Sequence, residues 1–247
     1  MRIVCLSPPN DNLNACLPVY VSLNGVDWVD TETCFSYYTN PEITNMFPKS
    51  GPYQGGTELL ITGSKFSNIT DPDNVKCRYT LLNNTRRAQP KYMPAIYRNS
   101  TTMMCISPNG FLGGEKIQVA LTFNGEDYSP DMTELIFHYY TIFGPFPRSG
   151  PADDCRDRNI AVRGAGFNSS LNVICQINNT DIAPRSISDN YIMCPMCLAD
   201  KDPNIFGSVK FGITLDGSWT DFGDFYYYKQ ISVATSYPPI GPSEGEG

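Results

Sequence analysis

The stretch Phe47-Pro48-Lys49-Ser50-Gly51-Pro52 occurs three times, with small changes, in this sequence of 247 residues. The second copy is Phe146-Pro147-Arg148-Ser149-Gly150-Pro151, and the third is Tyr237-Pro238-Pro239-Ile240-Gly241-Pro242. The copies begin about 90 to 100 residues apart, which is the length of one β-sandwich domain. The spacing therefore predicts a tandem array of β-sandwiches, in which each copy of the stretch marks the start of a domain.

A second repeated feature is a β-hairpin ahead of each domain boundary. Strands of alternating apolar and polar residues lead through an Asn-Gly or Asp-Gly pair into an aromatic-rich strand, and an aromatic residue follows each turn. Both central residues of a type I′ turn need a positive φ, so these pairs predict tight two-residue hairpins. The hairpins cover residues 19–38, 119–140 and 211–228, with turns at Asn24-Gly25, Asn124-Gly125 and Asp216-Gly217 and aromatics at Trp28, Tyr128 and Trp219.

The composition supports an all-β chain and argues against several classes of partner. Aromatic residues make up 12% of the sequence, and glycine and proline number 20 each, which suits short strands and frequent turns. The net charge of −7 argues against nucleic acid, since phosphate binding needs a basic face, and against adhesion to anionic lipid. No run of about 18 apolar residues is present, so we expect no membrane insertion within this chain.

The repeats divide the chain into four parts. Residues 1–41 are expected to be the C-terminal half of a domain, and residues 42–140 and 141–229 are expected to be complete domains. Residues 230–247 would hold the first strand of a further domain. No Ser/Gly-rich linker separates the two complete domains, so we expect an elongated array of closely connected sandwiches.

Three features of the first complete domain follow one another in a familiar order. After the Pro-x-x-Gly-Pro stretch come Gly55-Gly56-Thr57, the strand text of residues 59–66, and a pair of cysteines. Together they resemble the IPT/TIG domain, an early-set immunoglobulin-like module of plexins, hepatocyte-growth-factor-receptor-like ectodomains and surface glycoproteins of protists and algae. The second complete domain departs from the pattern, because residues 153–157 replace the Gly-Gly-Thr text. The resemblance implies a β-sandwich fold; it does not imply one function.

The resemblance also implies how the shared cysteines pair. It joins Cys77 to Cys105 in the first complete domain, and Cys175 to Cys194 in the second. Cys5 matches Cys105, so we expect it to be unpaired within this chain, with its partner in a part of its domain that precedes residue 1.

Four further cysteines have no counterpart in the other domains. Cys16 and Cys34 flank the first hairpin and could bridge it, while Cys155 and Cys197 are both extras of the last complete domain and could pair with each other. Nine cysteines in a β-rich chain favour an oxidising compartment, although buried free thiols in a reducing one would also fit.

Asn-x-Ser/Thr sequons provide a second indication of compartment. They lie in loop text rich in Gly, Asn and Asp, where an attached glycan would be exposed. We therefore expect an extracellular or cell-surface glycoprotein with covalently attached glycans. The sequons begin at Asn68, Asn83, Asn99, Asn168 and Asn178.

Candidates for catalysis or metal binding are weak. Cys194-Pro195-Met196-Cys197 has redox or zinc spacing, but a zinc site usually needs a second such pair or a nearby histidine, and a redox pair belongs at a helix start. The single histidine, His138, lies on a predicted strand among aromatics and lacks the partners of a catalytic base. We therefore expect no enzyme activity, catalytic residue, metal site or cofactor.

Two surface features remain open to more than one interpretation. Asp71-Pro72-Asp73-Asn74 and Asp153-Asp154 could bind calcium, but their irregular spacing also fits Asx turns in a solvated loop. Tyr226-Tyr227-Tyr228 could stack on sugars or on a partner's side chains. A strand with one buried and one exposed aromatic face explains this run equally well.

Two functions follow from this organisation. The first is a structural or adhesive extracellular glycoprotein, in which the C-terminal strand of one copy completes the N-terminal half-domain of the next copy. Such pairing of a lone strand with an open sheet would give a head-to-tail filament. The alternative is the stalk of a plexin-like or growth-factor-receptor-like cell-surface receptor, which positions a ligand-binding domain that lies elsewhere.

Overall fold

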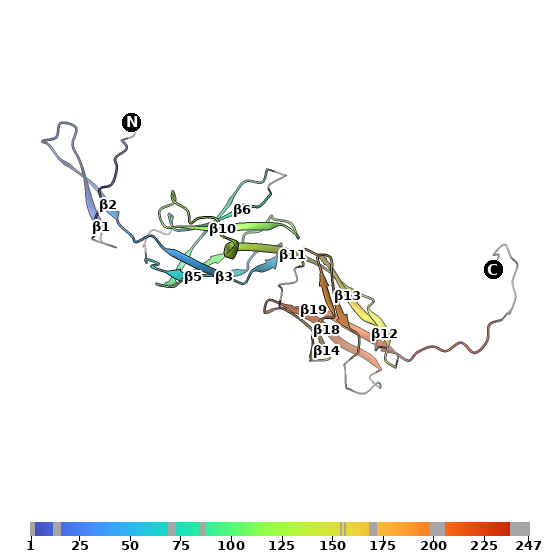
Figure 1. Cartoon of the computed structure of the whole chain (residues 1–247). Coiled ribbons are helices and arrows are strands. Elements are labelled where there is room, and N and C mark those ends of the chain that lie inside the picture. Colours follow the sequence, from blue (N-terminus) through green and yellow to red (C-terminus); the bar gives the residue numbers. More distant parts are fainter. Residues whose placement is uncertain are drawn as a thin grey trace. The chain divides into compact units, whose positions relative to one another are not determined.

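The computed structural model describes residues 3–11, 16–68, 73–83, 87–153, 155, 157–167, 172–197 and 206–237. These residues form nineteen β-strands and a single 3-10 turn, so the described chain is all-β, as predicted (Figure 1). The chain divides into two compact units, Met1–Thr141 and Ile142–Gly247. Among the described residues, no helix has the length and apolar character needed to cross a membrane.

The first unit contains a sandwich of two sheets. Alternation of apolar and polar residues in its strands puts one face of each sheet in the interior, as a period of two requires. One sheet has the order β3 (Glu42–Phe47), β5 (Glu58–Ser64), β9 (Thr102–Ile106) and β8 (Ile96–Asn99). The other has the order β11 (Ile136–Phe146), β10 (Lys116–Thr122), β6 (Lys76–Leu81) and β7 (Lys91–Pro94), and η1 (Thr133–Leu135) precedes β11.

The Pro-x-x-Gly-Pro stretch carries the chain from one sheet to the other. β3 pairs antiparallel with β5 and ends at Phe47, where the peptide bond to Pro48 is cis. The chain then continues as β4 (Ser50–Pro52), which pairs in parallel with β11 through Gly51 and Tyr139. The stretch therefore contributes to both sheets, which explains why it marks each domain.

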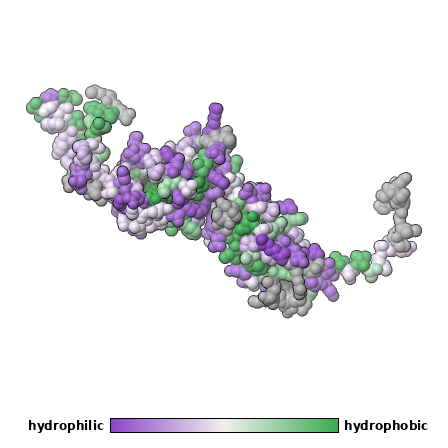
Figure 2. Space-filling model, in the orientation of Figure 1, coloured by the Kyte–Doolittle hydropathy of each residue, from purple (hydrophilic) through white to green (hydrophobic). Residues whose placement is uncertain are grey.

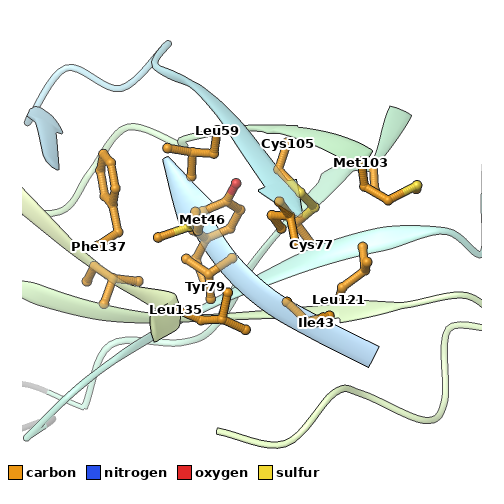
Figure 3. Close-up of a cluster of buried hydrophobic side chains, with 14 of the residues drawn as sticks. Ile43, Met46, Leu59, Cys77, Tyr79, Met103, Cys105, Leu121, Leu135 and Phe137 are labelled. Carbon is orange, nitrogen blue, oxygen red and sulfur yellow. A yellow bond between two sulfur atoms is a disulfide. The ribbon is translucent and has the colours of Figure 1, made fainter. Parts of the chain in front are cut away.

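The core of this sandwich fills the space between the two sheets (Figure 3). Met46 and Leu59 come from β3 and β5, and they face Tyr79 and Phe137 from β6 and β11; all four side chains are fully buried. Burying side chains of this size supplies the main favourable free energy of folding.

The second unit repeats this architecture. β12 (Ser149–Pro151) pairs in parallel with β19 (Ser218–Tyr228), as β4 pairs with β11. Its larger sheet has the order β12, β19, β18 (Gly207–Leu215), β14 (Val173–Ile177) and β15 (Thr180–Ile182). Its other sheet contains β16 (Ser186–Ser188), β17 (Tyr191–Pro195) and β13 (Asn159–Ala165), which neighbours β11.

A disulfide joins the two sheets of each sandwich. Cys77 on β6 is bonded to Cys105 on β9, with 6.3 Å between their Cα atoms. Cys175 on β14 is bonded to Cys194 on β17, with 5.8 Å between their Cα atoms. These bonds close loops of 28 and 19 residues, each of which stabilises the fold by about 3 kcal/mol in the chain-entropy description.

Residues before the first sandwich form a separate hairpin. β1 (Cys16–Val21) pairs antiparallel with β2 (Val29–Ser36) as a two-stranded sheet. A disulfide between Cys16 and Cys34 crosses it, with 5.3 Å between the Cα atoms. Figure 2 shows hydrophobic residues at the surface of this hairpin, in contrast to the buried faces of the sandwiches.

Only one of the three predicted tight turns has the expected geometry. At the third, Leu215 pairs directly with Ser218, and Asp216 and Gly217 have φ of 46° and 85°, as a type I′ turn requires. The prediction of two-residue turns at Asn24-Gly25 and Asn124-Gly125 is wrong. Longer loops connect the strands there, and only the glycine of each pair has a positive φ.

The reason is that the asparagine side chain caps the loop. Asn124 accepts hydrogen bonds at its Oδ1 from the backbone N–H groups of Glu126 and Asp127, at 3.0 and 2.8 Å, and its Nδ2 donates to the Asp127 carboxylate at 2.9 Å. Asn24 makes the equivalent bonds with Val26 and Asp27. These Asx turns replace the backbone turn, and an aspartate three residues after each asparagine signals them.

Substitution of the glycine in the Pro-x-x-Gly-Pro stretch is expected to affect the two sandwiches differently. A Cβ at Gly51 would lie 2.3 Å from Thr57 Oγ1 and 2.7 Å from Phe137 Cζ, whereas at Gly150 it would meet the flexible end of Met196, with Sδ at 2.3 Å. We expect Gly51→Ala to destabilise the first unit by about 1–3 kcal/mol in urea unfolding, because Thr57 and Phe137 are less able to move aside.

Gly150→Ala is the matched control and should cost the second unit less, since Met196 can change rotamer. Equal losses of unfolding free energy for the two variants would contradict the steric explanation.

Candidate functional site

A tyrosine hydroxyl is bonded to a backbone carbonyl at the same place in both sandwiches. Tyr139 on β11 donates to the carbonyl of Pro108 at 2.6 Å, and Tyr227 on β19 donates to the carbonyl of Met196. Each accepting carbonyl lies just after the second cysteine of the inter-sheet disulfide. The bond therefore ties the last strand of each module to the segment that carries this disulfide.

Both hydroxyls are held in the protonated form that donates this bond. Burial raises the pKa of Tyr139 well above its usual value and raises the pKa of Tyr227 to about 12. A ring from the same strand packs edge-on against each tyrosine: the centroids of Phe137 and Tyr139 are 5.0 Å apart, as are those of Phe225 and Tyr227. We call this combination, the bond from the tyrosine hydroxyl to the carbonyl and the edge-on ring packing, the tyrosine lock.

The described residues that were candidates for catalysis or metal binding do not come together in one site. His138 is half-buried on β11 beside Lys116, and burial, followed by the charge of Lys116, lowers the pKa of His138. Within the described ranges, no three His, Cys, Asp or Glu side chains are placed to hold a metal ion. Asp71, Pro72 and Asp154, part of the possible calcium loops, lie outside the described residues.

The cysteines of the Cys-x-x-Cys stretch belong to different disulfides. Cys194 is bonded to Cys175, and Cys197 is bonded to Cys155 with 5.2 Å between their Cα atoms. This stretch therefore has no dithiol for redox or zinc chemistry. Cys5 has an exposed free thiol.

The described sequon asparagines are exposed, on loops or at strand ends. Asn99 ends β8, and its Oδ1 accepts hydrogen bonds from the backbone N–H and the hydroxyl of Thr101, at 2.9 and 2.8 Å. Asn178 lies in the turn between β14 and β15, with a φ of 48°. Asn68 and Asn83 follow β5 and β6, while Asn168 lies outside the described residues.

The tyrosine run alternates between the core and the surface. Tyr227 points into the sandwich, whereas Tyr226 and Tyr228 are 53% and 37% exposed on the outer face of β19. β19 is therefore a strand with one buried and one exposed aromatic face, which was the second interpretation of the tyrosine run.

The aromatic residues after the second and third turns have roles that the sequence pattern left undefined. The guanidinium of Arg78 lies over the ring of Tyr128, 4.2 Å from its centroid, and Tyr92 is 6.4 Å from the same ring. In the second unit Trp219 lies over Gly212, where a Cβ would be 2.2 Å from its ring. Both aromatics cover the outer face of a sheet, and only strand pairing brings their partners within reach.

Comparison with known proteins identifies the module. The IPT/TIG domain family matches residues 41–135 and 142–227, so the chain belongs to the IPT/TIG family. These two ranges correspond to the two sandwiches, which are therefore immunoglobulin-like IPT/TIG domains in tandem.

Similar proteins include plexins. Plexin-A2 of Mus musculus and plexin-A2 of Homo sapiens are each 23% identical over 240 residues, covering 87% of this chain. The chain spans only 11% of the length of either relative.

Two solved structures also align with the chain. The full extracellular region of plexin A4 has 16% identity and a TM-score of 0.39, covering 88% of this chain and 18% of that one. A protein of unknown function from Bacteroides thetaiotaomicron has 17% identity and a TM-score of 0.29, and the match covers 76% of this chain and 50% of that one. Together with the plexin-A2 relatives, the four disulfides of the described residues identify the chain as extracellular.

The tyrosine lock can be tested by removing one hydroxyl. We expect Tyr139→Phe to lower the unfolding free energy of the first unit by about 0.5–1.5 kcal/mol, because the buried Pro108 carbonyl loses its donor. Chemical unfolding followed by fluorescence measures this change. Tyr92→Phe, at a side chain that is 53% exposed, is the control and should alter stability by less than about 0.5 kcal/mol. Equal effects of the two variants would contradict the lock.

Proposed function

We propose that this chain is part of the extracellular stalk of a plexin-like cell-surface receptor. The observation that carries the proposal is a pair of consecutive IPT/TIG modules in a chain that aligns over 87% of its length with plexin-A2. In this role the modules set the distance between the membrane and a ligand-binding domain, and their contribution is mechanical.

The internal construction of the modules suits such a spacer. Each sandwich has a disulfide between its sheets and a tyrosine that ties the last strand to the same region. Opening a module by separation of its sheets is therefore resisted by a covalent bond as well as by the core. We propose that the chain has no catalytic activity, because a spacer of this kind requires no reactive group.

Glycans are the second part of the proposal. The exposed sequon asparagines Asn68, Asn83, Asn99 and Asn178 suit N-linked glycans, and Asn168 is a further candidate by sequence. Bulky sugars at these positions would keep the surface hydrated and would limit contacts between neighbouring receptors.

Head-to-tail filament assembly is the less favoured alternative. The comparisons provide no support for it. Residues 231–237, the first part of the strand it requires, form no strand in the structure, and residues 238–247 lie outside the described residues. A measurement of self-association in solution distinguishes the filament from the stalk, because only the filament requires the chain to polymerise.

Glycan occupancy can be measured on the chain secreted from eukaryotic cells. We expect N-glycosidase treatment to lower its mass, and Asn99→Gln to remove the mass of one glycan, because Asn99 is exposed in an Asn-Ser-Thr sequon. Asn109→Gln changes an exposed asparagine outside any sequon and should leave the glycan mass unchanged. A secreted chain whose mass is insensitive to the enzyme would rule out this part of the proposal.

The stalk role predicts a chain that does not polymerise. In sedimentation velocity experiments, we expect the secreted chain to sediment as a species of constant size across a wide concentration range. On cells of the source organism, an antibody against the chain should label the surface and follow the membrane fraction. Continuous growth in size with concentration, together with antibody labelling of detached fibres, would instead establish the filament.

A further inference from the structure

Residues 3–11 and 16–38 reproduce the tyrosine lock of a complete IPT/TIG module. The hydroxyl of Tyr37 donates to the carbonyl of Pro8 at 2.7 Å, as Tyr139 donates to Pro108 at 2.6 Å. Pro8 and Pro108 lie one hundred residues apart, as do Cys5 and Cys105. This hydrogen bond joins segments 29 residues apart in one case and 31 in the other.

The aromatic packing of the lock is also repeated. The rings of Phe35 and Tyr37 have centroids 5.0 Å apart and an interplanar angle of 75°. The rings of Phe137 and Tyr139 are likewise 5.0 Å apart, at 84°. Residues 3–11 and 16–38 therefore have the local structure of the back half of a module, although the family match begins only at residue 41.

The face that this half-module should bury is open. Phe35 is 48% exposed, whereas its counterpart Phe137 is 0% exposed. The same contrast holds along the preceding strand: Leu17, Val19 and Val21 are only partly buried, and their counterparts Ile117, Val119 and Leu121 are at most 2% exposed. A sheet face with the sequence of a core thus lies at the surface.

The first unit shows what covers such a face. In Figure 3, Met46 and Leu59, from β3 and β5 of the other sheet, lie opposite Phe137. Tyr79 comes from β6, which pairs with β10 in the same sheet as Phe137. The last strand is also paired in parallel by the Gly-Pro strand, β4. The front half of the module, residues 42–102, therefore supplies both the apolar cover and an additional strand.

The hairpin is built to remain folded while this face is open. An isolated two-stranded hairpin is only marginally stable in water. Here the Cys16–Cys34 disulfide links the two strands, and the corresponding hairpin of β10 and β11 contains no cysteine. The extra bond keeps the half-module in the conformation that a partner would cover.

We propose that the open face of β1 and β2 is a docking surface for the front half of an IPT/TIG sandwich. Its occupant is a polypeptide with the chemistry of residues 42–102: a Gly-Pro strand that pairs beside β2, strands with alternating apolar residues, and a cysteine in the place of Cys77. That cysteine bonds to Cys5, completing a third inter-sheet disulfide.

The bond forms by thiol–disulfide exchange with a small disulfide such as oxidised glutathione. One cysteine thiolate attacks the oxidant and releases one glutathione thiolate, and the second cysteine thiolate then displaces the other. The two cysteines lose two electrons and two protons in total, and oxidised glutathione is reduced to two molecules of glutathione.

A graft of the chain's own front half tests the docking surface. Residues 42–102 are joined directly to Ile3 of the full chain, so that the grafted copy of Cys77 has the spacing to Cys5 that Cys77 has to Cys105. We expect Cys5 to resist alkylation in the unreduced, denatured graft. In the ungrafted chain, and in a graft carrying Cys77→Ser in the grafted copy, Cys5 should be alkylated. A folded graft in which Cys5 remains reactive would overturn the proposal.

Thermal unfolding provides a readout that is independent of the thiol. Phe35→Ser should lower the Tm of the grafted module by about 10 °C or more, because Phe35 is then buried, and should leave the Tm of the ungrafted chain unchanged. An equal response in both proteins would show that the face remains open and would contradict the proposal.

Native material tests the surface if the graft fails to fold. Peptide mapping of the unreduced protein from its source should find Cys5 joined to a cysteine that follows a Pro-x-x-Gly-Pro stretch by about 25 residues, as Cys77 follows Pro52. A free Cys5, or a bond between the Cys5 residues of two copies, would overturn the proposal. Neither result depends on the receptor role, which the sedimentation experiment tests separately.

Discussion

The covalent bond between the two sheets of each sandwich is the constraint on which the rest of the structure depends. Cys77 and Cys105 are completely buried at the centre of the first core, among side chains such as Leu59 and Tyr79 that fill the space between the sheets. Such a bond persists in an oxidising compartment, so the same two cysteines stabilise the module and fit its extracellular location. The Gly-Pro strand and the tyrosine lock then fix the first and last strands against this centre.

Much of this architecture was predictable from the sequence, because steric requirements limit the residues at a few positions. Gly51 and Gly150 pack so closely against neighbouring side chains that no Cβ fits without a shift, and each therefore recurs in the same short stretch. The domain period, the all-β class and the positions of the hairpins followed from this pattern. The two-residue turns at Asn24 and Asn124 were wrongly predicted, because a side chain that caps backbone N–H groups competes with the backbone turn.

Other features could not be obtained from local sequence. Arg78 and Tyr128 are 50 residues apart, and the strand pairing that brings the guanidinium over the ring is a property of the whole sheet. The Tyr37–Pro8 hydrogen bond likewise became visible only in three dimensions, although the aligned residues were present in the sequence. These contacts extend the module pattern to the N-terminal hairpin, where side chains that match the core of the first sandwich are partly exposed. The function that we propose is architectural: the two cross-linked sandwiches resist opening of their interiors.

The most direct measurement of the central claim is disulfide mapping of the unreduced chain secreted from eukaryotic cells. The account predicts four linked peptide pairs: Cys16 with Cys34, Cys77 with Cys105, Cys155 with Cys197, and Cys175 with Cys194. Free thiols at Cys77 and Cys105, or a bond from either of them to a cysteine of the second unit, would contradict it.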